Sequence, residues 1–242
     1  SKGQAKTNQH FFKNYLKARV IYQRTNGFFE PTVMPLVNHW GFGYTEKKPV
    51  EKIDSIKIAE IMPSVGFEKI EVVNDQSSDK LKLVKSNPTT QLDFSGIAKG
   101  YAVDEIGRFL EKQKIKHYLA EIGGETVGKG VNSVGKAWSI GINTPKENSS
   151  LTDFEEIVEL NNKAIATSGD YRQFYKIQGK KLSHIINPKT GFSEESDLLS
   201  VSVIANDCMT ADGYATAFFV LGRKEGILLA QQLDDIEALF IF

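Results

Sequence analysis

The chain of 242 residues has an ordinary globular composition, with 40% hydrophobic and 25% charged residues, and its formal net charge is zero. This balance excludes a general electrostatic attraction to nucleic acid, and no apolar run of the sequence is long enough to span a bilayer. The one cysteine excludes an internal disulfide and a zinc knuckle.

Before residue 90 the apolar pattern predicts two helices and a hairpin. Residues 10–25 repeat apolar side chains at helical spacing, and Gly27 is a typical helix stop. An ordered loop rich in aromatic residues follows. A second helix is expected over residues 51–62, and two short strands, 69–73 and 81–85, are expected to pair. The side chains expected to face inward from the second helix are Ile53, Ile56 and Ile61.

The rest of the chain predicts one long helix, a series of short strands and two C-terminal helices. The long helix is expected from Ser95 to Leu110, and the later ones over residues 210–221 and 225–233. The inward face of the long helix is expected to carry Ala98, Ala102, Ile106 and Phe109. The predicted strands are residues 118–122, 138–143, 155–160, 174–177, 182–186, 199–205 and 238–242. Because strands outnumber helices without regular alternation, we expect an α+β fold with mostly antiparallel sheets.

A possible anion site lies at the start of the long helix. Asp93, Gly96 and Gly100 stand among small residues there, and the first turn of a helix offers free backbone N–H groups and a positive dipole. Glycines would let a ligand approach the backbone closely. An ordinary capped helix, with glycines that serve packing, explains these residues slightly better when they are considered alone.

Two further segments allow a ligand without requiring one. Residues 166–172, which include Ser168 and Gly169, could hold a pyrophosphate or form a plain polar loop. The segment Ile122-Gly123-Gly124-Glu125, with a glycine pair between two expected strands, is weak evidence for a ligand site, because such pairs commonly form turns or bulges.

His184 and Asp212 are candidate reactive side chains. His184 stands in an apolar strand before a proline-ended loop and could be a general acid or base, although a structural histidine is the default interpretation. Asp212 and Thr216 share one face of a helix, and a carboxylate beside a hydroxyl suits a hard cation such as Mg²⁺. An aspartate that complements the helix dipole is the better explanation of Asp212 alone.

No single motif decides the function, but their order along the chain does. Seven segments together resemble the ApbE family, whose members are understood as FAD:protein FMN transferases. They are Gly27–Val33, Trp40–Phe42, Asp93–Ala102, Glu121–Gly124, Thr167–Arg172, Ser183–Gly191 and Ala211–Thr216. Each motif has a high false-positive rate, whereas all of them in the family's order make chance similarity improbable.

This resemblance implies a T-fold-like α+β architecture with packed helices and a cleft for FAD between two parts of the chain. It implies Mg²⁺ held by Asp212, Thr216 and a backbone carbonyl near Gly96, and it matches His184 to a histidine needed for transfer. The implied FAD contacts are Phe28, Phe29, Glu30, Asp93, Lys99, Ser168, Gly169, Ile185 and Ile186. One domain is expected over residues 1–242, with the N-terminal part of the family domain missing.

The chain departs from the family pattern at three places. Phe28-Phe29-Glu30 replaces the usual Ala-Phe-Asp, which changes the loop expected over the flavin. Asn187 stands where the family usually has aspartate, and Ala215 stands where some members have a second aspartate beside the metal-binding threonine. The last two changes leave the expected metal site with less negative charge.

The implied reaction is a magnesium-dependent transfer of FMN from FAD to a threonine or serine hydroxyl of another protein, with release of AMP. His184 would orient or deprotonate the hydroxyl, while Asp93 and Lys99 position the cofactor. Two alternatives stay open. One is an FAD pyrophosphatase that yields FMN and AMP. The other is a non-catalytic flavin-binding protein, which the smaller number of acidic residues around Asp212 favours. The resemblance also implies a flavin-acceptor subunit of a membrane redox complex. It further implies an exported, lipid-anchored protein on the periplasmic or cell-surface side.

Overall fold

The computed structural model describes residues 8–44, 50, 53–75, 80–145, 153–169, 174–177, 180–183, 185–193 and 197–242. Contacts within the chain divide it into two compact units, and each is described by itself. Unit 1 comprises Ser1–Phe94 and Tyr175–Glu194, and unit 2 comprises Ser95–Phe174 and Glu195–Phe242.

Unit 1 combines helices with a small hairpin. Its elements are α1 (Gln9–Arg24), α2 (Met34–His39), α3 (Ser55–Ile61), the 3₁₀ helices η1 (Met62–Ser64) and η2 (Phe67–Lys69), and the strands β1 (Ile70–Asp75) and β2 (Lys80–Lys85). β1 and β2 pair antiparallel, which confirms the predicted hairpin. A second two-stranded sheet consists of β8 (Phe174–Ile177) and β9 (Lys180–Ser183), so its second strand lies earlier than the predicted residues 182–186.

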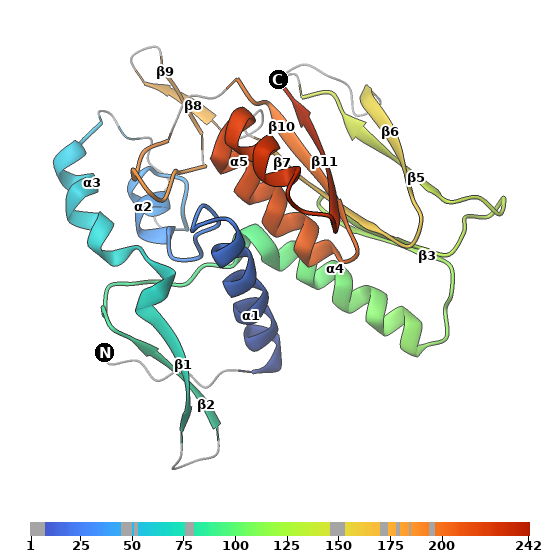
Figure 1. Ribbon diagram of the computed structural model, residues 1–242, viewed down its shortest axis with the longest axis horizontal. Helices are drawn as coiled ribbons and strands as arrows, with labels where there is room; N and C mark the ends of the chain where they lie inside the picture. Colours follow the sequence, from blue (N-terminus) through green and yellow to red (C-terminus); the bar gives the residue numbers. More distant parts are fainter. Residues whose placement is uncertain are drawn as a thin grey trace. The chain divides into compact units, whose positions relative to one another are not determined.

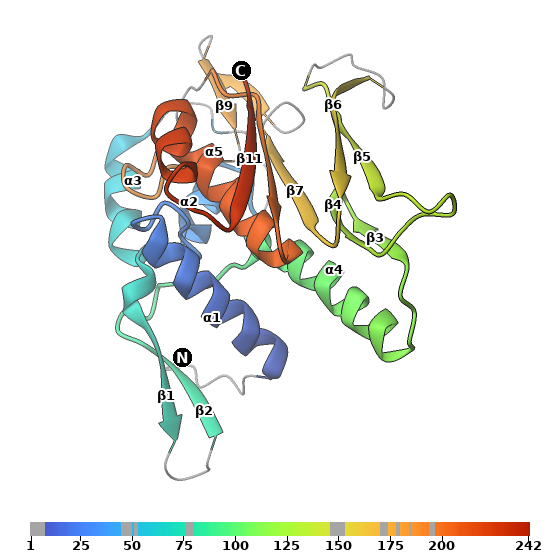
Figure 2. The ribbon, with the colours of Figure 1, turned by 45° about the vertical axis from the view of Figure 1, so that its right-hand side comes forward.

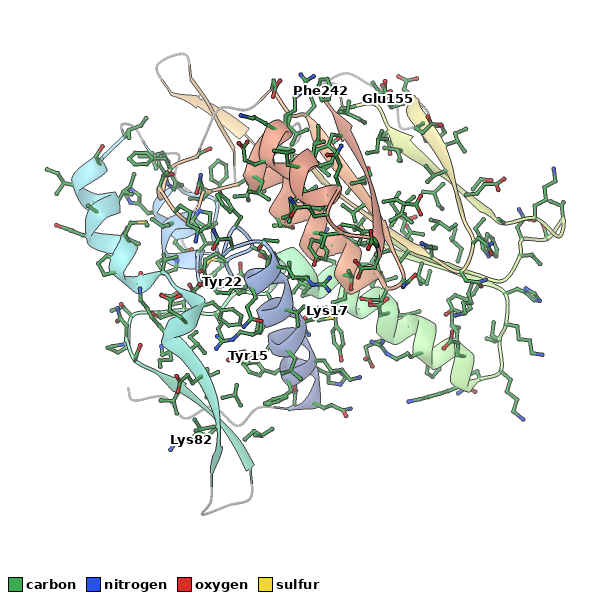
Figure 3. All side chains as sticks on the ribbon, in the orientation of Figure 1. Tyr15, Lys17, Tyr22, Lys82, Glu155 and Phe242 are labelled. Carbon is green, nitrogen blue, oxygen red and sulfur yellow. The ribbon has the colours of Figure 1, made fainter. Side chains whose placement is uncertain are left out.

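α1 confirms the first predicted helix and packs on η2 and β1 through aromatic side chains. The hydroxyl of Tyr15 donates to the carbonyl oxygen of Ile70 at 3.1 Å, and its ring meets Phe67 edge-on with 5.2 Å between centroids. Two helical turns after Tyr15, the hydroxyl of Tyr22 donates to Glu68 Oε2 at 2.9 Å. Figure 3 shows both tyrosines projecting from α1.

The core of unit 1 corrects two predictions. α2 forms inside the segment predicted as a loop, because Pro35 lies in its first turn, where no backbone N–H is needed. On the second predicted helix, Ile58 is buried while Ile56 is 76% exposed and Ile53 is 39% exposed. The predicted inward positions of Ile53 and Ile56 were therefore wrong, since α3 begins only at Ser55 and packs through Ile58, whereas Ile61 packs against the buried cluster as predicted. The buried cluster is Leu36, Trp40, Ile58, Val65 and Ile186.

Unit 2 is built on an antiparallel sheet with two long helices. Its strands are β3 (Tyr118–Ile122), β4 (Glu125–Lys129), β5 (Trp138–Asn143), β6 (Phe154–Leu160), β7 (Ala164–Gly169), β10 (Ser200–Ala205) and β11 (Ile236–Ile241). Five of them form a sheet in the order β11-β10-β7-β4-β3, in which every pairing is antiparallel, and β5 pairs separately with β6. The helices α4 (Ser95–Lys112) and α5 (Cys208–Ala230) pack on each other and on the five-stranded sheet (Figure 1 and Figure 2). This arrangement confirms the α+β fold.

The sequence pattern missed β4 and β7, although both lie inside the five-stranded sheet. Their residues are mostly small or polar, as in Glu125–Lys129, and lack the run of β-branched and aromatic side chains that marks a strand. Small side chains fit here because the helices cover this part of the sheet, and Ala164 and Ala166 are fully buried.

α4 buries a different face from the predicted one. Ile106 is 39% exposed and Phe109 is 60% exposed, because the helix turns Gly100, Asp104 and Gly107 inward. Apolar periodicity does not mark this face clearly, because glycine and aspartate occupy buried positions beside the apolar Ile97, Tyr101 and Val103. α5 joins the two predicted C-terminal helices across a kink at Gly222, where φ is 76°. Among the described helices, none combines the length and hydropathy that a membrane crossing requires.

Candidate functional site

α4 and α5 touch at a point that requires glycine. A Cβ on Gly100 would lie 2.4 Å from the carbonyl oxygen of Cys208, so a larger residue would push the helices apart. Asp104 fastens the same contact: its Oδ1 accepts the N–H of Cys208 at 2.8 Å, and its Oδ2 accepts the N–H of Met209 at 3.0 Å. A carboxylate from α4 thereby satisfies two free N–H groups at the start of α5. Residues 96–104 and 208–216 are called the helix crossing below.

Asp212 is a buried carboxylate at the helix crossing, with 4% of its surface exposed. Its Oδ2 accepts the N–H of Gly100 at 2.9 Å, while its Oδ1 receives no hydrogen bond from the described residues. Burial raises the pKa of Asp212 to about 6; the hydrogen bond from Gly100 opposes this rise, and the negative charge of Glu125 adds to it. One oxygen thus fixes the side chain, and the other is left to accept a ligand.

The helix crossing also brings together other oxygens that were predicted to bind. The hydroxyl of Thr216 donates to the carbonyl oxygen of Gly96 at 3.4 Å. Ser168 Oγ lies 3.4 Å from the same hydroxyl oxygen, at the end of β7. Both distances are at the upper end of the hydrogen-bond range, so the contacts are weak and a ligand could replace them. The assignment of these residues to metal and FAD stays a prediction.

Glu125 is not among the predicted site residues, although the sequence marked its segment, residues 122–125, as weak evidence for a ligand. It begins β4 directly after Gly123 and Gly124, whose φ angles of 62° and 102° make the turn. Its side chain is 2% exposed and its Oε1 pairs with the ammonium of Lys99, which is 49% exposed. Its Oε2 is buried and finds no hydrogen-bond partner among the described residues. The available signal was a carboxylate that directly follows a glycine pair at a strand start.

The oxygen atoms of the helix crossing fit a hard cation. Mg²⁺ prefers oxygen ligands, and Asp212, Thr216 and Gly96 offer a carboxylate, a hydroxyl and a carbonyl. Within the described ranges no three His, Cys, Asp or Glu side chains converge as a metal centre, so a bound Mg²⁺ would complete its shell with waters and ligand phosphates. In the described part of the chain, Asp104, Glu125 and Asp212 are buried carboxylates of this region, and of the three only Glu125 forms an ion pair, with Lys99. This excess of negative charge favours a cation.

The predicted FAD contacts of the first loop, in unit 1, have structural partners. Phe29 is 3% exposed. Glu30 Oε1 accepts the N–H and the hydroxyl of Thr32 at 2.9 and 2.6 Å, and its Oε2 accepts the N–H of Phe67 at 3.2 Å. Burial raises the pKa of Glu30, and these hydrogen bonds oppose the rise. The ring of Phe28 lies 5.8 Å from the ammonium of Lys189. Their contact with FAD stays a prediction.

The remaining predicted residues of unit 1 are only partly described. The backbone N–H of Asp93 donates to the carbonyl oxygen of Pro31 at 2.8 Å. Ile185 is half-buried, and Ile186 belongs to the buried cluster around Trp40. His184 lies outside the described residues, as do residues 170–172 of the polar loop. Their roles stay predictions.

Known proteins resemble the chain over most of its length. A sequence profile of the ApbE family matches residues 1–240. The FAD:protein FMN transferase of Haemophilus influenzae is 39% identical over 222 residues, which cover 92% of this chain and 63% of that protein. The protein of the same name from Vibrio cholerae is 38% identical over 207 residues, which cover 86% of this chain and 59% of that protein. The chain thus spans about three fifths of the length of these curated relatives.

Solved structures share the fold. The flavin transferase ApbE from Vibrio cholerae has a TM-score of 0.84 at 35% identity, over 100% of this chain and 74% of that one. The Pseudomonas stutzeri flavinyl transferase ApbE in its apo form has a TM-score of 0.85 at 31% identity, over 99% of this chain and 71% of that one. These structures confirm the α+β architecture that the resemblance implies. Since the family profile also matches nearly every residue, the chain belongs to the ApbE family.

Proposed function

We propose that this protein is a magnesium-dependent FAD:protein FMN transferase, which moves FMN from FAD to a threonine or serine hydroxyl of a target protein and releases AMP. The observation that carries the proposal is the helix crossing, where Asp212, Thr216 and the Gly96 carbonyl offer oxygen ligands beside the first turn of α4. The names of the curated relatives support FAD as the substrate.

The start of α4 suits the pyrophosphate of FAD. Its free N–H groups and the positive end of its dipole attract anions, and Lys99 carries an ammonium one turn further on. Asp212 and Thr216 would hold Mg²⁺ with the Gly96 carbonyl. The metal would neutralise the charge that grows on the leaving phosphate.

The chemistry is a displacement at phosphorus. The oxygen of the target hydroxyl attacks the FMN-side phosphorus of FAD, and the bond from that phosphorus to the bridging oxygen breaks. AMP leaves with the bridging oxygen and its negative charge. The hydroxyl proton passes to His184, because an imidazole has an ordinary pKa close to neutral and serves as a general base. This role rests on the family resemblance of residues 183–191.

The test is a product analysis. The protein is incubated with FAD and Mg²⁺, with and without a peptide that carries a serine or threonine, and AMP and peptide-bound flavin are measured. A transferase releases AMP in step with covalent flavin on the peptide. AMP and free FMN without modified peptide would identify a pyrophosphatase instead, and FAD binding without AMP would identify a flavin-binding protein.

The target and the location belong to the same proposal and rest on the family resemblance. We infer a flavin-acceptor subunit of a membrane redox complex, modified on the exported side where this protein is lipid-anchored. Cell fractionation followed by detection of the native protein tests the location. Recovery in the cytoplasmic fraction would contradict it.

A further inference from the structure

The ion pair between Glu125 and Lys99 removes positive charge from the place where the proposed function needs an anion to bind. Lys99 lies near the start of α4, and its ammonium pairs with Glu125 Oε1. A Cβ on Gly123 would lie 3.7 Å from Glu125 Oε2 and 3.9 Å from Lys99 Cδ. The glycine turn, the lysine stem and the carboxylate are therefore neighbours.

Fold stability does not explain this carboxylate well. A buried ion pair stabilises a fold only when further hydrogen bonds satisfy both partners. Glu125 Oε2 is buried without a partner among the described residues, and Lys99 is half exposed. By contrast, Asp104 in the same crossing uses both oxygens on backbone N–H groups. Glu125 therefore has an electrostatic effect that the packing of unit 2 does not require.

The charges at the site determine which form of a ligand it accepts. Glu125 cancels the charge of Lys99, and the buried Asp212 adds a negative charge. A free pyrophosphate would meet net negative charge, which opposes its binding. A pyrophosphate that carries a divalent cation would meet the same groups with its own charge reduced.

We propose that Glu125 makes ligand binding depend on a divalent cation: by neutralising Lys99, it lets the site take the magnesium complex of FAD in preference to free FAD. The inference rests on the proposed function, and it names the form of the substrate. It also assigns to Glu125 a selective role that acts through Lys99.

The experiment measures FAD affinity rather than turnover. The dissociation constant of FAD is determined by flavin fluorescence in EDTA and in excess Mg²⁺, and the ratio of the two constants reports cation dependence. Glu125→Gln keeps the shape and an acceptor for Lys99 but removes the charge. We expect it to bind free FAD roughly tenfold more tightly than the wild type in EDTA, and to gain less from Mg²⁺, as removal of a nearby like charge requires. Inorganic pyrophosphate, used as a competitor in EDTA, should likewise bind Glu125→Gln more tightly than the wild type.

A matched control uses Glu111, a glutamate of α4 that pairs with a lysine of β4. Glu111 pairs with Lys129 at 3.5 Å, and both side chains are 45% exposed. Glu111→Gln also removes one negative charge from unit 2, but it should leave the affinity ratio unchanged, because solvent screens its charge. Melting temperatures of both variants show whether they are folded.

Two further variants separate charge balance from a structural role. Lys99→Met should weaken FAD binding in EDTA and raise the ratio, and adding Glu125→Gln to it should bring the ratio back toward the wild-type value. This pair of results would also decide the matter if Glu125→Gln alone fails to fold.

An unchanged ratio in Glu125→Gln, in a wild type that binds FAD, overturns the inference and leaves the transferase proposal standing. FAD binding with the expected ratios but without AMP release overturns the transferase activity and supports the role of Glu125. A wild type that binds no FAD overturns both.

Discussion

Glu30 in unit 1 and Glu125 in unit 2 are both largely buried, but their oxygens are used differently. Glu30 accepts hydrogen bonds from Thr32 on one oxygen and from the Phe67 backbone on the other. Glu125 has one oxygen on the half-exposed Lys99 and one with no partner among the described residues. A buried carboxylate whose acceptor positions are filled holds a loop in place, whereas one with an open position is prepared for a ligand. By this criterion we infer that Glu125 has an acceptor position open to a ligand, while the contact of Glu30 with FAD stays a prediction.

The largest expected effect is a loss of reaction rate, and it tests whether His184 of unit 1 acts as the general base. His184→Ala is expected to keep FAD binding and to lose roughly 10²–10⁴-fold in the rate of AMP release, the usual contribution of a general base. Rate and FAD affinity are measured side by side. His10→Ala is the control, because His10 is an exposed histidine of the same unit. Joint loss of folding and FAD binding in His184→Ala would support a structural histidine.

The next largest effect is on fold stability, and it tests how strongly burial disfavours the ionised carboxylate of Asp212 in unit 2. The pKa of Asp212 is about 6 in the folded protein against an ordinary 3.8, a difference that corresponds to about 3 kcal/mol. The folded state holds this proton more tightly than the unfolded state. Without a divalent cation, the wild type should therefore lose stability as pH rises from about 4 to about 6 and stay at the lower level above it. Asp212→Asn should lack this loss and be the more stable protein at pH 7 by up to about 3 kcal/mol.

Urea unfolding in EDTA at about pH 4.5 and about pH 7 measures this difference. Asp197→Asn is the control, since Asp197 is exposed and pairs with Arg223 at the surface. If Asp212→Asn were the less stable protein at pH 7, the ionised carboxylate would be a stabilising part of the helix crossing, contrary to the assignment of Asp212 to a ligand.

The contrast predicts a loss of stability at Glu30. Glu30→Ala leaves Thr32 and the Phe67 N–H without their acceptor, and we expect the free energy of unfolding to fall by about 2–3 kcal/mol. Denaturant unfolding measures it against Glu71→Ala, which removes an exposed glutamate of β1 and should change stability by less than about 0.5 kcal/mol. Equal effects of the two substitutions would show that the bonds of Glu30 are not structural.

The smallest effect concerns the cation. Asp212→Asn should raise the Mg²⁺ concentration for half-maximal AMP release roughly 10–100-fold, the range found when a group that supports a metal site is removed. Asp104→Asn is the control, because Asp104 lies in the same crossing with both oxygens committed to the start of α5. The same Mg²⁺ requirement in Asp212→Asn and wild type would exclude Asp212 from the metal site.

Local spacing in the sequence was sufficient for much of the fold. Helix α1, the β1–β2 hairpin and the apolar strand β10 follow from the periodicity and punctuation of neighbouring residues, and so did the α+β class. The motif order was sufficient for the family, and a spacing of four residues placed Asp212 and Thr216 on one helix face. Apart from the motif order, those inferences use residues a few positions apart, whose relative placement a helix or strand fixes without further information.

Local spacing could not predict which face of α4 is buried, or that Glu125 pairs with Lys99. Gly100 and Asp104 face α5 because the helices meet there, and Asp104 and Asp212 bond to backbone groups 104 and 112 positions away. Glu125 meets Lys99 from 26 positions away, across the contact of α4 with β4. Periodicity reports which residues are apolar, but these positions are occupied by glycine and carboxylates. Whether such a residue is buried, paired or open to a ligand depends on which distant backbone the packing brings to it.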